Sequence, residues 1–341
     1  METAKHDKKQ VDGSKWAGYN TAVTGGGTAR LERKRHRMKR IFCALLALCL
    51  TAGLLGGALA EDEKPSVVTA IYPQYDFARA IAGDRVSLKM LLKPGAEVHT
   101  YEPAPQDIMA IDGCDLFVYG GGESDQWAEG LLAATGHEDR RVLALMDCVP
   151  LLEEEGEDGE EAEYDEHVWT SPKNAMLIVQ ALCDALCGID PAGEETYRAN
   201  TAAYLEELTR LDEAFRAVVA AGERDTIIFG DRFPLLYFAH EYGLNYLAAF
   251  PGCSTETEPS AATMTELIRG AAKIKAPLVL YLELSNGAIA RAVAEQTGAD
   301  THVFYACHNL TQDDFEAGKT YLDFMWENVD TLREALGEKA D

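Results

Sequence analysis

The chain of 341 residues lacks the patterns that mark several common metal and catalytic sites. It has eight cysteines but no Cys-x-x-Cys pair, which argues against a zinc site built from four thiolates. It also has no His-Glu-x-x-His motif, the helical signature of many zinc hydrolases. We therefore expect a protein that is not an enzyme. A zinc-dependent hydrolase with Glu102 as its general base remains the alternative from another class.

Basic residues are scarce after residue 60. Of the 31 Lys and Arg residues 11 precede Glu61, whereas only 4 of the 57 Asp and Glu residues do. The rest of the chain therefore carries 20 basic and 53 acidic residues, a formal net charge of −33. Such a chain repels nucleic acid and attracts cations. We expect a divalent metal ion, and no nucleic acid, among its partners.

The first 60 residues have the order of an export signal. A basic cluster at 30–40 precedes an apolar run at 41–60, which ends in the small-residue pattern Ala58-Leu59-Ala60. We expect an exported protein, in the periplasm or on the outer face of the cytoplasmic membrane, with cleavage near Ala60. Because the apolar run is about long enough to span a bilayer, an uncleaved anchor is the alternative. Residues 1–37 are polar and without periodicity, so translation is expected to begin at Met38.

Short β-rich runs alternate with helical stretches from residue 61 onward, as in parallel sheets connected by helices. Strands are expected at 66–71, 86–92, 115–119, 141–145, 226–229, 246–250, 278–282 and 302–306. Four strands in each half predict an α/β protein of two similar lobes, each a four-stranded parallel sheet with flanking helices. The expected boundaries are 1–60 for the extension and signal peptide, 61–172 for the first lobe, 173–222 for a helical linker and 223–341 for the second lobe.

One long helix is predicted between the lobes, at 194–221. Apolar residues recur there at helical spacing, and no Pro or Gly occurs before Gly222. A continuous helix is stiffer than a loop hinge, so we expect small shifts at the site in place of a large closure of the lobes. The cleft between the lobes, beyond the carboxyl ends of the strands, is the expected ligand site.

An acidic segment at 153–166 has ten carboxylates in fourteen positions. Like-charge repulsion and the lack of apolar residues predict a mobile loop. Such a loop either is a solvated surface or collects cations weakly beside the cleft.

Cysteines after the apolar run are too few for a disulfide scaffold but allow single bridges. Cys183 and Cys187 lie four residues apart on a predicted helix, where packing in the core is expected. Cys253 and Cys307 each follow a predicted strand, and we expect a disulfide between them.

Two histidines lie in loops of the predicted first lobe. His99 follows the strand at 86–92, where a Pro-Gly turn presents it at the carboxyl end of the strand. His167 lies before a helix that starts with proline. Glu102 and Asp165 are expected to orient these imidazoles, because a metal-ligating histidine commonly donates its second ring nitrogen to a carboxylate.

Several motifs along the chain share their order and spacing with one family. They are His99-Thr-Tyr-Glu-Pro-Ala-Pro-Gln-Asp107, Asp115-Leu-Phe-Val-Tyr-Gly-Gly-Gly-Glu-Ser-Asp-Gln-Trp127, Asp165-Glu-His-Val-Trp-Thr-Ser-Pro-Lys-Asn-Ala175, Tyr242-Gly-Leu244, Glu258-Pro-Ser260 and Tyr321-Leu-Asp-Phe-Met-Trp-Glu-Asn328. Over residues 66–337 the chain resembles the zinc and manganese solute-binding proteins of bacterial ABC importers. The resemblance implies two α/β lobes, a linking helix and one metal ion held between the lobes. His99 and His167 match the two histidine ligands of the family's first lobe.

The second lobe departs from the family pattern. The family has a ligating His or Glu ten residues before the Tyr-Gly-Leu motif, and this chain has Arg232 there, which does not ligate. Asp231 is the nearest candidate ligand, with capping of a helix near Phe233 as its alternative role. The family's last ligand, an Asp after the final strand, falls near His308, which we expect to be the third ligand. His240, in a helix, and His302, at the start of a strand, are not expected to ligate.

Three histidines and one carboxylate suit Zn²⁺, whereas Mn²⁺ prefers more oxygen ligands. The expected function is a receptor that captures Zn²⁺ between two lobes and delivers it to an ABC permease and its ATPase. A Mn²⁺ receptor and a metal-binding surface adhesin are the alternatives. No coiled coil or exposed apolar stripe demands a partner, so a monomer is expected. Because histidine ligands must be neutral, metal affinity should fall below about pH 6.5.

Overall fold

The computed structural model describes residues 37–38, 64–135, 140–154, 163–252 and 258–337. The chain divides into two compact units, Met1–Glu63 and Lys64–Asp341. In the first unit the described residues, Arg37 and Met38, are helical. The expected apolar run at 41–60, with its cleavage site, lies outside the described residues. Among the residues that are described, no helix has both the length and the apolar composition needed to cross a membrane.

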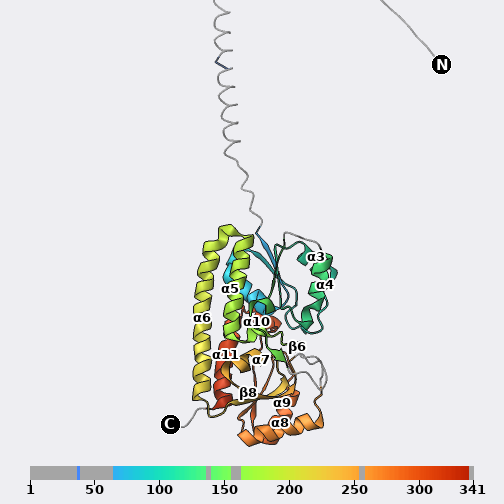
Figure 1. The fold of residues 1–341 in the computed structure, drawn as a ribbon, viewed down its shortest axis with the longest axis vertical. Helices are drawn as coiled ribbons and strands as arrows, with labels where there is room; N and C mark the ends of the chain where they lie inside the picture. The colour runs from blue at the N-terminus through green and yellow to red at the C-terminus, as the bar shows by residue number, and fades with distance from the viewer. Residues whose placement is uncertain (1–36, 39–63, 136–139, 155–162, 253–257, 338–341) are drawn as a thin grey trace, which may run out of the picture. The chain divides into compact units, whose positions relative to one another are not determined.

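The second unit contains two four-stranded parallel sheets, which confirms the predicted fold class (Figure 1). Their strand orders are β2-β1-β3-β4 and β10-β9-β7-β8. The strands are β1 (Ser66–Thr69), β2 (Ser87–Met90), β3 (Leu116–Tyr119), β4 (Arg141–Ala144), β7 (Thr226–Arg232), β8 (Asn245–Phe250), β9 (Leu278–Tyr281) and β10 (Asp300–Val303). Of the predicted strands only the last is clearly displaced. It ends early because the amides of Ala306 and His308 bond to the Glu283 carboxylate and not to a neighbouring strand.

Helices surround both sheets. They are α2 (Tyr72–Ala82), α3 (Pro105–Asp112), α4 (Gln126–Ala134), α5 (Pro172–Ile189), α7 (Leu236–Tyr242), α8 (Ala261–Ile274), α9 (Ala288–Thr297), α10 (Gln312–Glu316) and α11 (Tyr321–Leu336), besides α6. The central strand β3 consists of four buried residues, Leu-Phe-Val-Tyr, as expected for a parallel sheet covered on both faces. Ser171 caps α5 by accepting a hydrogen bond from the Asn174 amide, with Pro172 as the first helical residue.

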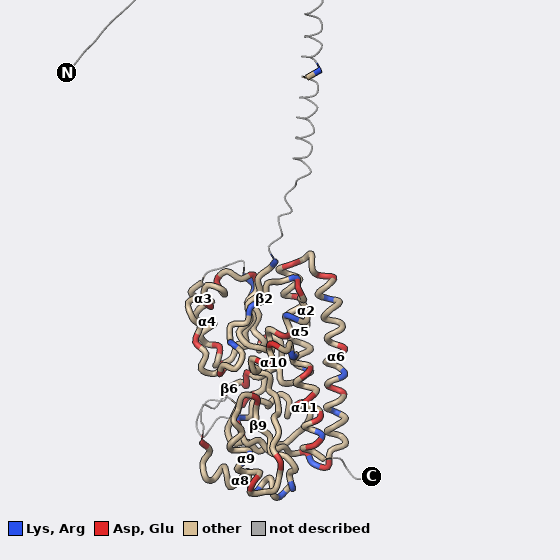
Figure 2. Tube along the Cα trace, turned by 180° about the vertical axis from the view of Figure 1, so that it is seen from behind, with Lys and Arg blue, Asp and Glu red and all other residues tan. Residues whose placement is uncertain are grey.

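The predicted long helix is α6, Glu194–Ala221, with 28 residues. It begins after a short turn in which the Asp190 side chain accepts the Gly193 amide, and it ends at Gly222. In Figure 1 it runs beside both sheets, with α5 and α11 packed against it. Its outer face carries acidic and basic residues one turn apart (Figure 2), including the pair of Glu194 and Arg198.

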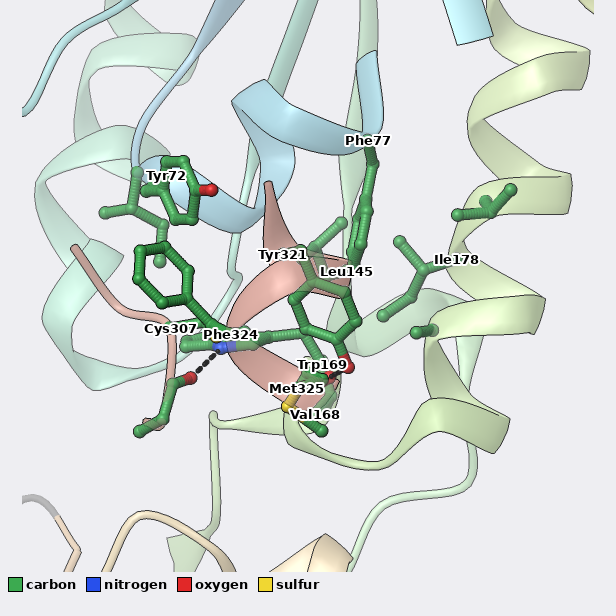
Figure 3. Packing of buried hydrophobic residues seen from close by; sticks show 14 of the residues in the cluster. Tyr72, Phe77, Leu145, Val168, Trp169, Ile178, Cys307, Tyr321, Phe324 and Met325 are labelled. Carbon is green, nitrogen blue, oxygen red and sulfur yellow. Dashed lines mark hydrogen bonds between the residues drawn. The ribbon is translucent and has the colours of Figure 1, made fainter. Parts of the chain in front are cut away.

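One hydrophobic core joins the two lobes. Phe77 of α2 contacts the rings of Tyr204 of α6 and Tyr321 of α11, with centroids 6.1 and 4.9 Å apart. The Tyr321 hydroxyl donates to the Trp169 carbonyl at 2.8 Å, and the Trp169 indole donates to the Ala306 carbonyl at 2.8 Å. Figure 3 shows Phe77, Tyr321 and Trp169 packed together. Because these contacts reach from the first lobe into the second, the lobes are held as one body.

The disulfide prediction is wrong. Cys307 is a free, buried cysteine whose side chain packs in the shared core (Figure 3), and Cys253 lies outside the described residues. Cys183 is buried in the core as predicted, and Cys187 packs against it.

The two ends of the acidic segment are ordered, so the predicted mobile loop is wrong for them. Strands β5 (Glu153–Glu154) and β6 (Glu163–Tyr164) pair antiparallel. Glu154 accepts the Gly252 amide at 2.7 Å, and Asp165 and Glu166 are buried. Amide, hydroxyl and imidazole donors offset the cost of burying these carboxylates. Residues 155–162 lie outside the described part of the chain.

Replacing Phe77 with Ala should lower the free energy of unfolding by about 3–5 kcal/mol, because it leaves a cavity in the core shared by both lobes. Urea unfolding should show one transition that moves to lower urea. The matched control is Met109→Ala, whose side chain is 73% exposed, with an expected change below about 0.5 kcal/mol. Two separate transitions, only one of them sensitive to Phe77, would contradict a shared core.

Candidate metal centre

Three of the four predicted site residues come together. One ligand atom from each of His99, His167 and His308 lies within 4.8 Å of the others. The ring centroids of His167 and His308 are 4.6 Å apart, and His99 lies 6.0 and 5.8 Å from them. His99 follows β2, His167 precedes α5, and His308 follows β10. Both sheets thus present the loops at the carboxyl ends of their strands to one point, where ligands bind in open α/β sheets.

Asp231 does not join this group of described residues. Its carboxylate accepts the amides of Arg232 and Leu282 at 2.9 and 3.4 Å. The helix-cap role is also wrong, because Asp231 still belongs to β7 and α7 begins only at Leu236. The Arg232 guanidinium lies 3.3 Å from a carboxylate oxygen of Glu97, across the two lobes. An ion pair between the lobes therefore occupies the position where the family pattern has a ligand.

Two ring nitrogens of the cluster have no hydrogen-bond partner among the described residues. They are Nε2 of His167 and Nε2 of His308, both shielded from solvent. A buried polar atom without a partner costs about 1–3 kcal/mol, so it needs an explanation such as a bound ion. Tetrahedral zinc holds its nitrogen ligands about 3.3 Å apart, at the usual Zn–N length of about 2.0–2.1 Å. The three nitrogens are close enough to reach that spacing by small movements.

His167 is oriented by Asp165, as predicted. Its amide donates to Asp165 Oδ1 at 2.8 Å, and its Nδ1 lies 3.2 Å from the same oxygen. The Tyr237 hydroxyl in turn donates to the Asp165 carbonyl at 2.8 Å. Because the carboxylate engages Nδ1, the ring keeps Nε2, which has no partner among the described residues, as its free ligand atom.

The prediction for Glu102 is wrong, because Glu102 is exposed and His99 is held by other residues. His99 Nδ1 lies 2.9 Å from the Ser124 hydroxyl and 3.7 Å from Glu166 Oε1. Sequence reasoning missed Ser124 and Glu166. The one available signal was the run of three glycines directly after the buried strand β3, which indicates a close approach of another part of the chain.

Glu283 shapes the loop that carries His308. Its carboxylate accepts the amides of Ala306 and His308 at 2.8 and 3.1 Å, on either side of Cys307, whose φ is +61°. Burial raises the pKa of Glu283 to about 7. No local sequence pattern predicts this role of Glu283, since Glu283 lies 25 residues from His308.

Three hydrogen bonds tie the loop of His99 to the loop of His308. The Asn309 amide group donates to the carbonyls of Lys93 and Ala96, both at 2.8 Å. The Gly95 amide donates to the Leu310 carbonyl at 2.8 Å, from a backbone with φ of +79° that favours glycine. These bonds fix the separation of two candidate ligands that come from different lobes.

The electrostatic surroundings of the three imidazoles differ. Burial and the neighbouring imidazoles lower the pKa of His99 and lower that of His308 well below its usual value. Burial alone would also lower the pKa of His167, but Asp165, Glu166 and Glu154 outweigh it and raise that pKa. At neutral pH two imidazoles are therefore ready to bind a cation, and His167 is the one that holds a proton most strongly.

The approach to the cluster is acidic. A cavity of about 50 Å³ is lined by His99 and His308 and by Arg232 and Glu283. A larger cavity of about 320 Å³ shares Glu97, Arg232 and Glu283 with it and is also lined by Asp231. Acidic side chains outnumber the one guanidinium along this approach, which favours the entry of a cation. Asp231 thus lines the approach to the cluster.

Two α/β lobes, each built on a parallel sheet, enclose a buried cluster of histidines. This arrangement is that of a two-lobed, metal-binding solute receptor. Residues 67–335 match the family described as zinc-uptake complex component A, periplasmic, and the chain belongs to this family. Because the family consists of metal-binding transport proteins, the expectation that the chain is not an enzyme is confirmed.

The chain is also similar to individual proteins that bind or take up zinc. The chain is 31% identical over 312 residues to the zinc-binding lipoprotein AdcA of Streptococcus pneumoniae. This alignment covers 89% of this chain and 62% of AdcA. It is 29% identical over 306 residues to the high-affinity zinc uptake system protein ZnuA of Bacillus subtilis, in an alignment that covers 86% of this chain and 94% of ZnuA. The crystal structure of the Zn(II)-bound ZnuA-like domain of S. pneumoniae AdcA aligns with a TM-score of 0.69 and 30% identity, over 80% of this chain and 99% of that domain. The chain thus spans 62% of the length of AdcA.

Asn309 offers a test of the connection between the loops. Asn309→Ala should destabilise the protein by about 1–3 kcal/mol, because the carbonyls of Lys93 and Ala96 lose their donor. Asn309→Asp, of nearly the same shape, should be at least as destabilising, since a carboxylate does not donate to either carbonyl. Urea unfolding and hydrogen exchange of the Gly95 amide measure both effects. An aspartate variant as stable as the wild type would contradict this role.

Proposed function

We propose that this protein is an exported receptor that captures Zn²⁺ between its lobes through His99, His167 and His308 and delivers it to an ABC permease and its ATPase. The observation that carries the proposal is the buried cluster of three imidazoles, two of whose nitrogens have no partner among the described residues. The names of the relatives, a zinc-binding lipoprotein and a zinc uptake protein, support the same cargo and role.

The donor set favours zinc over manganese. Three imidazole nitrogens suit Zn²⁺, whereas Mn²⁺ prefers carboxylate, carbonyl and water oxygens. With Asp231 outside the cluster, we propose that solvent supplies the fourth ligand. The hydrolase alternative gains no support, since Glu102 is exposed and the carboxylate next to His99 is that of Glu166, which already accepts the Ser124 hydroxyl.

The layout of the chain fits this role. We propose a leader that is cleaved near Ala60, a first lobe at 61–172, a helical linker at 173–222 and a second lobe at 223–341. A monomer is sufficient, because both lobes that supply the ligands belong to one chain. Membership in a family described as periplasmic supports export.

Titration calorimetry of the metal-free protein with Zn²⁺ and Mn²⁺ tests the proposal. The wild type should bind one Zn²⁺ more tightly than Mn²⁺. Each of His99→Ala, His167→Ala and His308→Ala should weaken zinc binding by about 100-fold or more, beyond the 10–100-fold typical for residues that only orient a ligand.

Two matched controls accompany these variants. His240→Ala removes an exposed histidine, and His302→Ala removes a second histidine outside the cluster; both should leave zinc affinity nearly unchanged. Weak binding of several ions that survives the histidine substitutions would contradict the site. Tight Mn²⁺ binding with weak Zn²⁺ binding would identify Mn²⁺, and not Zn²⁺, as the cargo.

The pH dependence should follow His167. Because its pKa is raised, a proton competes with zinc there, and affinity should fall about tenfold per pH unit below that pKa. His99 and His308, with lowered pKa values, should add their own competition only at lower pH. Zinc titrations between pH 8 and pH 5 measure the slope, and an affinity that is constant over this range would count against histidine ligands.

A further inference from the structure

A hydroxyl group connects His99 to a buried carboxylate. Ser124 Oγ lies 2.9 Å from His99 Nδ1 and 2.5 Å from Glu166 Oε1. The Ser124 amide also donates to Glu166, at Oε2, at 3.0 Å. Both oxygens of one carboxylate thus hold the serine whose hydroxyl contacts the imidazole.

The chemistry of these groups determines the direction of each hydrogen bond. A carboxylate only accepts, and a serine hydroxyl has a single hydrogen to donate. The Ser124 hydroxyl therefore gives its hydrogen to Glu166 and accepts one from His99 Nδ1. The neutral His99 ring then carries its hydrogen on Nδ1, which leaves the lone pair on Nε2.

We propose that Ser124 is a positioning residue which, held by Glu166, presets His99 as an Nε2 donor for the metal ion. The inference rests on the proposed zinc site and adds to it the residues that select the ligand atom of His99. Asp165 acts directly on His167, so the adjacent pair Asp165 and Glu166 orients both histidines of the first lobe.

The glycines before Ser124 make this arrangement possible. A Cβ atom at Gly122 would lie 2.3 Å from both Cβ and Oε2 of Glu166, so a larger residue there would displace the carboxylate. Gly121 has a φ of +98°, a conformation that glycine adopts without strain. The Gly120 amide donates to the buried Asp125 at 2.6 Å, which closes the turn around Ser124. The three glycines thus have a role in placing Ser124 against Glu166.

The test compares the wild type with Ser124→Ala, Ser124→Thr and the control Ser87→Ala, which removes an exposed hydroxyl on β2. Zinc affinity is measured by competition with a chromophoric chelator. The tautomer of His99 in the metal-free protein is measured by ¹⁵N nuclear magnetic resonance, and thermal unfolding reports the integrity of each variant.

We expect the metal-free wild type to show His99 with hydrogen on Nδ1. Ser124→Ala should mix the two tautomers and weaken zinc binding about 10–100-fold, the range known for partners that orient a ligating histidine. Ser124→Thr keeps the hydroxyl and should restore both the tautomer and most of the affinity. Ser87→Ala should match the wild type.

Two results would overturn the inference. One is a wild-type protein in which His99 carries its hydrogen on Nε2. This tautomer measurement needs no variant, so it remains decisive even if Ser124→Ala does not fold. The other is a folded Ser124→Ala protein with unchanged tautomer and unchanged zinc affinity. A wild type that does not bind zinc at all would instead refute the proposed function.

Discussion

The structure is organised around three imidazoles that come from both lobes and meet at one point. His167 and His308 bury nitrogens that have no partner among the described residues, which costs free energy. Left free, such rings would rotate or move apart to reach water. The surrounding structure prevents this by giving each one a separate support. Asp165 holds His167, Ser124 with Glu166 holds His99, and the loop of His308 is bonded to Glu283.

Those supports are reinforced by contacts that join the two lobes. The rings of Phe77, Tyr204 and Tyr321 pack together from three helices, and Asn309 links the two ligand-bearing loops. The ion pair of Arg232 and Glu97 adds a contact across the lobes beside the cluster. In such a frame the ligands are close to their binding geometry before the ion arrives, which reduces the entropy lost on binding. The acidic residues along the approach favour entry of the ion.

Patterns of local sequence were enough for the fold. Alternation of strands and helices predicted both sheets, and helical spacing without proline or glycine predicted α6. His99, His167 and Asp165 were found because turn residues and neighbouring carboxylates mark them within a few positions. Contacts between distant residues could not be found in this way. Nearness in sequence predicted Glu102 as the carboxylate that orients His99. The structure instead has Glu166, which acts on His99 through Ser124, 42 residues away from Glu166 in the sequence. Likewise Asp231 lies next to Arg232 in sequence, but backbone amides hold its carboxylate away from the cluster.

The central claim is that three imidazoles bind one zinc ion, and X-ray absorption spectroscopy of the protein loaded with one equivalent of Zn²⁺ tests it most directly. The account predicts a four-coordinate ion with three imidazole nitrogens at about 2.0–2.1 Å and one further light atom. A six-coordinate shell made mainly of oxygen, or any sulfur ligand, would contradict it. In that case zinc would bind to the acidic surface or to a cysteine, and not between the lobes.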